Sequence, residues 1–221
     1  MLRMDIRNLG LKNSCEHFIK HVKNQNKHYY YLRDNLCVLV NNFFYKKLKQ
    51  EKVYRNSIIK KWKRIIPRKL INSPVSYEMM VYMNSIMESY DTDINLKCIA
   101  NPINLKLNEI PLKGQIDLIT KEDNYYNVYY FLYNSLHELD INFMNNVMPG
   151  ILSLGFYSDF KKGNFNIIVH NISTNKKRVI KDAGEKSNVL IKKTLSLTSK
   201  IKDNCKGCTL RGKCKHEKYR S

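Results

Sequence analysis

Apolar residues recur at intervals of three and four over roughly the first ninety residues. The pattern is clearest in three stretches, CEHFIKHV, LCVLVNNFFYKKLKQ and VSYEMMVYMNSIMESY. Such spacing lines up apolar side chains on one face of a helix. Pro67 and Pro74 stand between these stretches, where proline ends or begins a helix. We therefore expect a helical region over residues 1–94.

From residue 95 the pattern changes to alternation with period two and to β-branched residues. It predicts strands in INLKCIANPINLKLNE, IPLKGQIDLITKED, NVYYFLYNS, NFNIIVHNIST and KKRVIKD. INFMNNVMPGILSLGFYSDF, between the third and fourth of these, has helical spacing, although Pro149 and Gly150 interrupt it. An amphipathic helix is expected over about residues 182–204. This order predicts an α/β fold with a mixed sheet flanked by helices.

The chain is strongly basic. It has 39 Lys and Arg against 19 Asp and Glu, a formal net charge of +20, which indicates a polyanionic partner. Nucleic acid is the first candidate and an anionic membrane surface is the rival. No apolar run has the length of a membrane span, and MLRMDIRNLGLKNS lacks the apolar centre of a signal peptide. We expect a soluble, intracellular protein without a membrane partner.

The charge is concentrated in residues 46–69, called the basic segment below, which hold eleven Lys and Arg against one acid, Glu51. Most charge runs are solvated helix faces, but the scarcity of carboxylates here favours contact with nucleic acid. Tyr54 and Trp62 would either stack on bases or pack in the core, and for Trp62 the core is favoured. The candidate contacts are Lys46, Lys47, Lys49, Lys52, Arg55, Lys60, Lys61, Lys63, Arg64, Arg68 and Lys69.

Three cysteines, Cys205, Cys208 and Cys214, crowd together in NCKGCTLRGKC. Without a signal peptide the thiols should stay reduced, which favours a metal site over disulfides. His216 would complete a zinc site of three sulfurs and one nitrogen. Two further cysteines, Cys37 and Cys98, lie in apolar stretches and are expected to be buried.

An acid, Asp117, follows a glycine in LKGQIDLI, within a predicted strand. Alternation places it on the strand face opposite to the one that Ile116 and Leu118 share. It is either a structural aspartate or a ligand of a hard cation such as Mg²⁺.

Together these features resemble the RecB-like branch of the PD-(D/E)XK nucleases, which includes CRISPR-associated and AddB-type iron-sulfur exonucleases. That family has a helical region with one cysteine, a G-x-I-D strand, a D/E-x-K strand, a helix marked by Q and Y, and a terminal C-x2-C-x5-C. Cys15 in NSCEHF, Asp117 in GQID, and the three clustered cysteines stand in this order. The resemblance covers essentially the whole chain.

The resemblance implies a restriction-endonuclease-like sheet at residues 95–204, preceded by the helical region 1–94 with its basic segment. It implies that Cys15, Cys205, Cys208 and Cys214 hold a [4Fe-4S] cluster. Residues 205–221 would then close on Cys15 and staple the two termini together. Zinc remains the alternative metal. The family also favours DNA over RNA as the partner.

The catalytic motif is missing from the strand after Asp117. NVYYFLYNSL contains neither an acid nor a lysine, and Met148 and Leu152 stand where the family has Q and Y. None of the nearest carboxylates is followed by a lysine two positions later; they are Glu122, Asp123, Glu138 and Asp140. Glu78 or Glu88 of the helical region would be an additional ligand, without a compelling placement.

One carboxylate does not assemble the metal site of phosphodiester hydrolysis. We therefore expect a DNA-binding pseudonuclease, a subunit of a replication, recombination or transcription complex. The first alternative is an active Mg²⁺- or Mn²⁺-dependent DNA exonuclease with a migrated site and Asp117 as its surviving catalytic metal ligand. The second is a zinc-stabilised module that binds an acidic protein.

Overall fold

The computed structural model describes residues 4–5, 26–91, 94–107, 110–133, 147–160 and 163–198. Their first part contains a two-residue strand and four helices: β1 (Met4–Asp5), α3 (Lys27–Leu48), α4 (Arg55–Ile65), α5 (Arg68–Ile71) and α6 (Pro74–Ser89). The second part alternates strands and helices: β2 (Leu96–Leu107), β3 (Ile110–Glu122), β4 (Tyr125–Leu132), α8 (Met148–Phe160), β5 (Asn164–Asn171), β6 (Lys176–Ile180) and α9 (Ala183–Thr198).

The strands form one mixed sheet, as the sequence predicts. Its order is β1-β3-β4-β5-β6, with β2 also paired to β3. The β2–β3, β3–β4 and β5–β6 pairs are antiparallel, and β4–β5 is parallel. A parallel pair requires a crossover connection, and α8 lies within the connection between β4 and β5.

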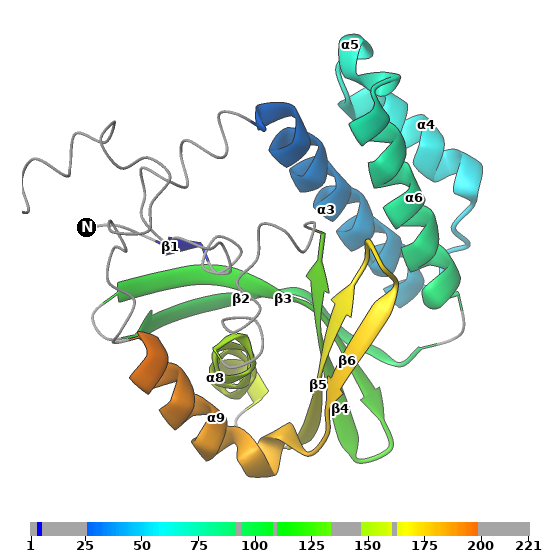
Figure 1. The fold of residues 1–221 in the computed structure, drawn as a ribbon. Coiled ribbons are helices and arrows are strands. Elements are labelled where there is room, and N and C mark those ends of the chain that lie inside the picture. The colour runs from blue at the N-terminus through cyan, green and yellow to red at the C-terminus, as the bar shows by residue number, and fades with distance from the viewer. Residues whose placement is uncertain are drawn as a thin grey trace, which may run out of the picture.

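Helices cover both faces of the sheet (Figure 1). On one face, α3, α4 and α6 pack in a cluster that includes Phe44, Trp62, Tyr129 and Phe131. On the other, α8 packs in a cluster that includes Val128 of β4. Odd-numbered β4 residues therefore face α3 and α6, whereas even-numbered ones face α8, as expected for a strand buried on both sides.

The two prolines punctuate the helices as expected. α4 ends just before Pro67, and Pro74 is the first residue of α6. There its missing N–H leaves no hydrogen bond unmade. Ser73 caps α6 by accepting a hydrogen bond of 3.1 Å from the Ser76 N–H.

Two local details differ from the sequence-based expectation. Met4 and Asp5 form a strand parallel to β3 inside the region predicted as helical. Pro149 and Gly150 do not interrupt α8 but lie within its first turn. A Cβ on Gly150 would come within 2.0 Å of Thr194 Oγ1, so the glycine allows α8 and α9 to pack closely.

Candidate functional site at the fork between β3 and β4

The β3 and β4 strands separate beside Asp117. Their paired residues run from Glu122 and Tyr125 to Leu118 and Tyr129. Beyond that point β3 remains paired with β2, while β4 remains paired with β5. We call this point of separation the fork.

The Asp117 carboxylate bridges the fork. The Phe131 N–H donates a hydrogen bond of 2.7 Å to Asp117 Oδ2, and Gln115 Nε2 donates one of 3.0 Å to Oδ1. Asp117 is only 2% exposed. A buried backbone N–H that has lost its strand partner needs another acceptor, and the carboxylate supplies it. Of the two predicted roles for Asp117, the structural one is thus directly visible.

The prediction for the faces of β3 is wrong. Ile116 packs on the α8 side of the sheet and Leu118 on the α3 side. In β2, Ala100 lies between the partners of these two residues and has a φ of 52°. This left-handed backbone conformation marks an irregularity that breaks the alternation of a regular strand pair.

Phe131 and Tyr133 have the two-residue spacing that the resemblance expects of an acid and a lysine near Asp117. They are two residues apart on or next to β4, and the Phe131 backbone touches the Asp117 carboxylate. Both side chains are buried in the cluster beneath α3 and α6. The Phe131 ring stacks on Phe44, with centroids 5.9 Å apart. Both positions are thus part of a buried aromatic core.

A hydrogen-bonded chain of Tyr90, His170 and Asn175 adjoins this core. The Tyr90 hydroxyl lies 3.0 Å from His170 Nδ1, and His170 Nε2 lies 2.9 Å from Asn175 Oδ1. Because an amide oxygen only accepts, Nε2 carries a proton, and in the neutral ring Nδ1 accepts from the Tyr90 hydroxyl.

Burial shifts the titration of both rings. It lowers the pKa of His170, an effect that the Lys177 charge strengthens and the hydrogen bond to Asn175 opposes. Burial also raises the pKa of Tyr90, with smaller contributions from Tyr129 and Asp117. Both groups are therefore uncharged near neutral pH. The sequence analysis missed His170, whose signal was a histidine within the apolar alternation of NFNIIVHN.

The other carboxylates on the predicted strands do not join Asp117. Glu122 ends β3 and Asp123 lies in the turn before β4, and both are exposed. Glu138 and Asp140 lie outside the described residues.

The carboxylates of α6 are placed just as unfavourably for a metal site. Glu78 accepts a hydrogen bond from the Tyr82 hydroxyl, and Glu88 is exposed. Among the described residues there is no group of three or more His, Cys, Asp or Glu that could hold a metal ion. Within the described residues the fork therefore offers one carboxylate, and each of its oxygens already accepts a hydrogen bond. Met148 and Leu152, in place of the Q and Y, are fully buried in the α8 cluster.

The predicted cluster ligands lie outside the described residues, as does His216. The [4Fe-4S] and zinc alternatives therefore remain predictions. Of the two remaining cysteines, Cys37 is buried, as predicted, and Cys98 is half-buried. Burial raises the pKa of the Cys98 thiol.

Eight of the eleven cations of the basic segment are exposed, and two of the other three lie near the end of α3. Lys47 Nζ donates hydrogen bonds to the carbonyl oxygens of Tyr90 and Asp91 at the end of α6. Lys46 lies 3.8 Å from Glu51. Lys61 is half-buried, and the exposed members are Lys49, Lys52, Arg55, Lys60, Lys63, Arg64, Arg68 and Lys69.

The two aromatic residues of the basic segment differ in exposure. Trp62 is 2% exposed and donates a hydrogen bond of 2.9 Å to Ser76 Oγ, which confirms the core prediction. Tyr54, immediately before α4, is 65% exposed. Only Tyr54 of the two presents its ring to a partner.

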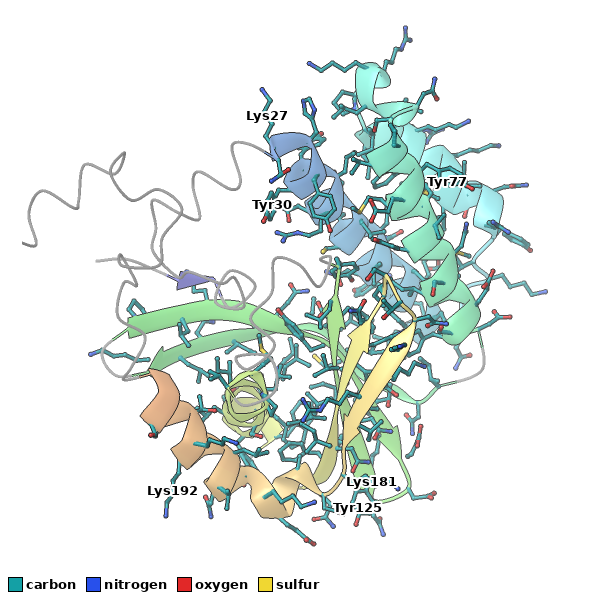
Figure 2. All side chains as sticks on the ribbon, in the orientation of Figure 1. Lys27, Tyr30, Tyr77, Tyr125, Lys181 and Lys192 are labelled. Carbon is teal, nitrogen blue, oxygen red and sulfur yellow. The ribbon has the colours of Figure 1, made fainter. Side chains whose placement is uncertain are left out.

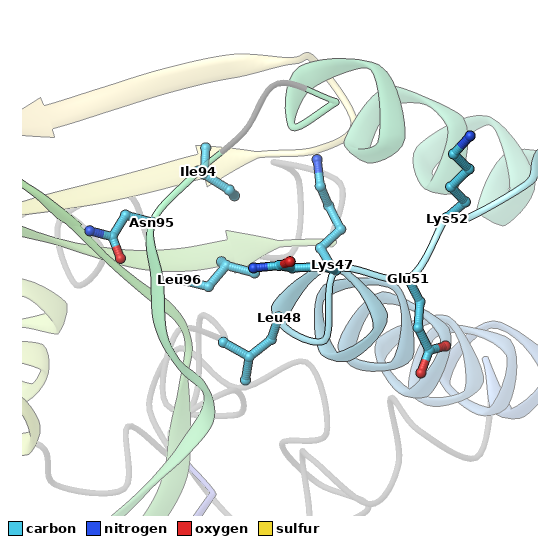
Figure 3. Close-up of a pocket in the computed structure, with 8 residues that line it drawn as sticks. Lys47, Leu48, Glu51, Lys52, Ile94, Asn95 and Leu96 are labelled. Atoms are coloured by element: carbon cyan, nitrogen blue, oxygen red, sulfur yellow. The ribbon is translucent and has the colours of Figure 1, made fainter.

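A hollow of about 780 Å³ lies between the end of α3 and the start of β2 (Figure 3). The Lys47 and Lys52 side chains extend to one side of it and Glu51 to the other. Two lysines and one acid, Glu51, thus line the hollow, and backbone carbonyls hold Lys47 in place. A pair of acids that could bind a metal ion is not among the described residues that line it.

No protein-family model matches the chain, and no curated protein matches it. Among solved structures, the crystal structure of SSO0001 shows a weak likeness. It has 12% identity over 81% of this chain and 95% of that chain, with a TM-score of 0.32. A likeness at this level assigns neither fold family nor function. In the described ranges no helix is both long and apolar enough to cross a membrane.

Proposed function

We propose that this protein is an intracellular nucleic-acid-binding pseudonuclease. In this proposal the sheet is of the PD-(D/E)XK type, the hydrolytic centre is lost, and DNA is preferred to RNA. A [4Fe-4S] cluster on Cys15, Cys205, Cys208 and Cys214 staples the termini, and the protein works as a subunit of a replication, recombination or transcription complex.

The observation that carries the binding function is the excess of cationic over acidic side chains around α4 and α5. Residues 52–77 contain eight Lys and Arg and no acid. Seven of the eight cationic side chains are exposed, the exception being Lys61. Cations without nearby carboxylates suit the phosphate backbone of a nucleic acid, which gives strongly salt-dependent and weakly sequence-selective binding.

The loss of hydrolysis is supported by the fork. Asp117 is the acid that the resemblance would make a metal ligand, yet Gln115 and the Phe131 N–H occupy its oxygens. Phe131 and Tyr133 replace the acid and lysine with buried aromatic rings. These contacts weigh against the active exonuclease.

Binding is tested with two triple variants that remove the same charge from different places. Lys60, Lys63 and Arg64 of α4 are changed to Gln in one, and Lys181, Lys192 and Lys193 in the other. All six are exposed. Lys181 and Lys192 lie near α9, far from α6 and its Tyr77 (Figure 2).

We expect the α4 variant to bind DNA about tenfold or more weakly and with a shallower salt dependence. The control should lose much less. Equal losses in both variants, or no DNA binding by the wild type at low salt, would contradict the proposal. The second result would favour an acidic protein partner.

Catalysis is tested on the same preparations with Mg²⁺ or Mn²⁺. We expect no degradation of DNA. Degradation that disappears on Asp117→Ala would replace the pseudonuclease with the active exonuclease.

A further inference from the structure

A groove of about 310 Å³ lies between α4 and α6. Its apolar walls come from Ile59 and Trp62 of α4, Ile71 of α5 and Met80 of α6. Ligand pockets span roughly 300–1,000 Å³. This groove lies at the lower end of that range and has room for one small planar group.

The floor of the groove is fixed in place. Trp62 Nε1 donates its hydrogen bond to Ser76 Oγ, and the Ser76 N–H is in turn bound by Ser73 at the cap of α6. The indole thus has its polar end satisfied and, at 2% exposure, supports the groove from within the core. Such a preformed surface costs little ordering on binding.

An aromatic side chain lines the same groove and remains 75% exposed. It is Tyr77, whose position on α6 is labelled in Figure 2. An exposed ring beside an apolar groove is available for stacking on a second planar group. Val81, one turn further along α6, is also exposed.

The charge beside the groove identifies its occupant as part of a polyanion. Lys63 lines the groove directly. Arg55, Ile59 and Lys63 are spaced at four-residue intervals, which places them in one row along α4. An apolar groove lined by one cation, Lys63, with a second, Arg55, two turns away in the same row matches a base and its neighbouring phosphates. An acidic peptide would pair with the cations but would leave the apolar groove unfilled.

We propose that the α4–α6 groove binds one unpaired base of a single-stranded nucleic acid, with Tyr77 stacking on it and Lys63 meeting its phosphate. This inference rests on the proposed function and adds strand preference to it. In a duplex both faces of a base are covered by its neighbours, so the groove selects single strands.

The test uses the full chain, a short labelled oligodeoxythymidine, and a duplex of the same length. Tyr77→Ala is compared with Tyr77→Phe and with Tyr125→Ala, a partly exposed tyrosine at the start of β4. We expect Tyr77→Ala to weaken single-strand binding about tenfold, equivalent to one stacked base of about 1.4 kcal/mol. Duplex binding should not change, and the other two variants should bind like wild type.

Trp62 is the sole tryptophan and lines the groove, so the intrinsic fluorescence of the protein reports on binding there. The oligodeoxythymidine should change its fluorescence over the concentration range in which it binds, whereas an abasic strand of the same length should not. Equal binding of the two strands, or unchanged binding by Tyr77→Ala, overturns the groove proposal. If the α4 triple variant still weakens DNA binding in that case, the proposed function stands without the groove.

Competition with oligoglutamate tests whether an acidic peptide occupies the same site as the strand. Failure of the peptide to displace the strand supports a nucleic-acid site. Displacement at equal charge concentration, with the same response of Trp62 fluorescence, overturns it.

Discussion

The backbone N–H of Phe131 donates a hydrogen bond of 2.7 Å to Oδ2 of Asp117. This hydrogen bond links Asp117, the acid that the sequence singles out, to β4. In β4 the expected acid and lysine are missing. At the fork the Asp117 carboxylate accepts a hydrogen bond from a backbone N–H that strand pairing leaves unpaired. A carboxylate in this position maintains the sheet whether or not a metal binds.

The first prediction is therefore that Asp117 contributes to stability. Asp117→Ala removes the acceptor of a buried N–H and should lower the free energy of unfolding by about 1–3 kcal/mol. Asp117→Asn keeps an oxygen that can accept from Phe131 and should cost less. Urea unfolding of the purified variants measures both.

Glu122→Ala is the matched control, since Glu122 is an exposed carboxylate of the same strand. It should change stability by no more than about 0.5 kcal/mol. An Asp117→Ala protein as stable as this control would show that the bridge across the fork contributes nothing.

The second prediction concerns pH. Burial lowers the pKa of His170 in the folded protein below its unfolded value of about 6.5. As the pH falls through about 6.5, the unfolded chain therefore takes up a proton that the folded protein does not. Stability from the neutral histidine is present above this pH and is lost below it.

Melting temperatures between about pH 7.5 and 5.5 test this pH dependence while most carboxylates stay ionised. The wild type should lose stability toward the acid end, and His170→Gln should show a shallower loss. His28→Gln, at an exposed position in α3, should retain the wild-type slope. Parallel slopes for wild type and His170→Gln would contradict the assignment.

The third prediction concerns the cysteine cluster. Protein purified without oxygen should be brown and contain iron and acid-labile sulfide. Cys15→Ser should lower both, together with thermal stability, because cluster binding is coupled to folding. Cys98→Ala, at a half-buried cysteine outside the predicted set, should retain the iron. A colourless protein with one zinc ion, unaffected by Cys15→Ser, would favour the site that uses His216.

Local patterns predicted the described strands and helices from β2 onward. Strands buried on alternate faces leave a direct periodic signal, and Pro67 and Pro74 set helix boundaries through their own backbone restrictions. The core position of Trp62 was also favoured from the sequence. These features depend on near neighbours in the chain, which the sequence contains.

The fork and the His170 chain depend on residues far apart in sequence. Ile116 and Leu118 lie on different sides of the sheet next to the irregular backbone of Ala100 in the neighbouring strand, whereas alternation assumes a regular strand. Tyr90 and His170 are 80 positions apart and meet through tertiary packing. Neither relationship leaves a local pattern to be detected.

The last prediction asks whether the fork can accept a D/E-x-K motif. Phe131→Glu with Tyr133→Lys introduces an acid and a lysine at this spacing beside Asp117, without changing net charge. Both side chains would enter an aromatic core that includes Phe44 and Tyr90. Losing a buried Phe typically costs about 3–5 kcal/mol, a large part of a typical domain stability of about 5–15 kcal/mol. Burying the new charges adds to that cost.

We therefore expect the double variant to unfold or aggregate rather than to cut DNA. The comparison is Phe131→Leu with Tyr133→Phe, which keeps both positions apolar and should fold with a smaller loss of stability. Circular dichroism and a nuclease assay with Mn²⁺ separate the outcomes. A folded double variant that cleaves DNA, and stops doing so on Asp117→Ala, would contradict this expectation. It would mean that α3 and α6 leave room for a metal at the fork, and that two side chains, not the packing around them, decide whether the fork can hydrolyse DNA.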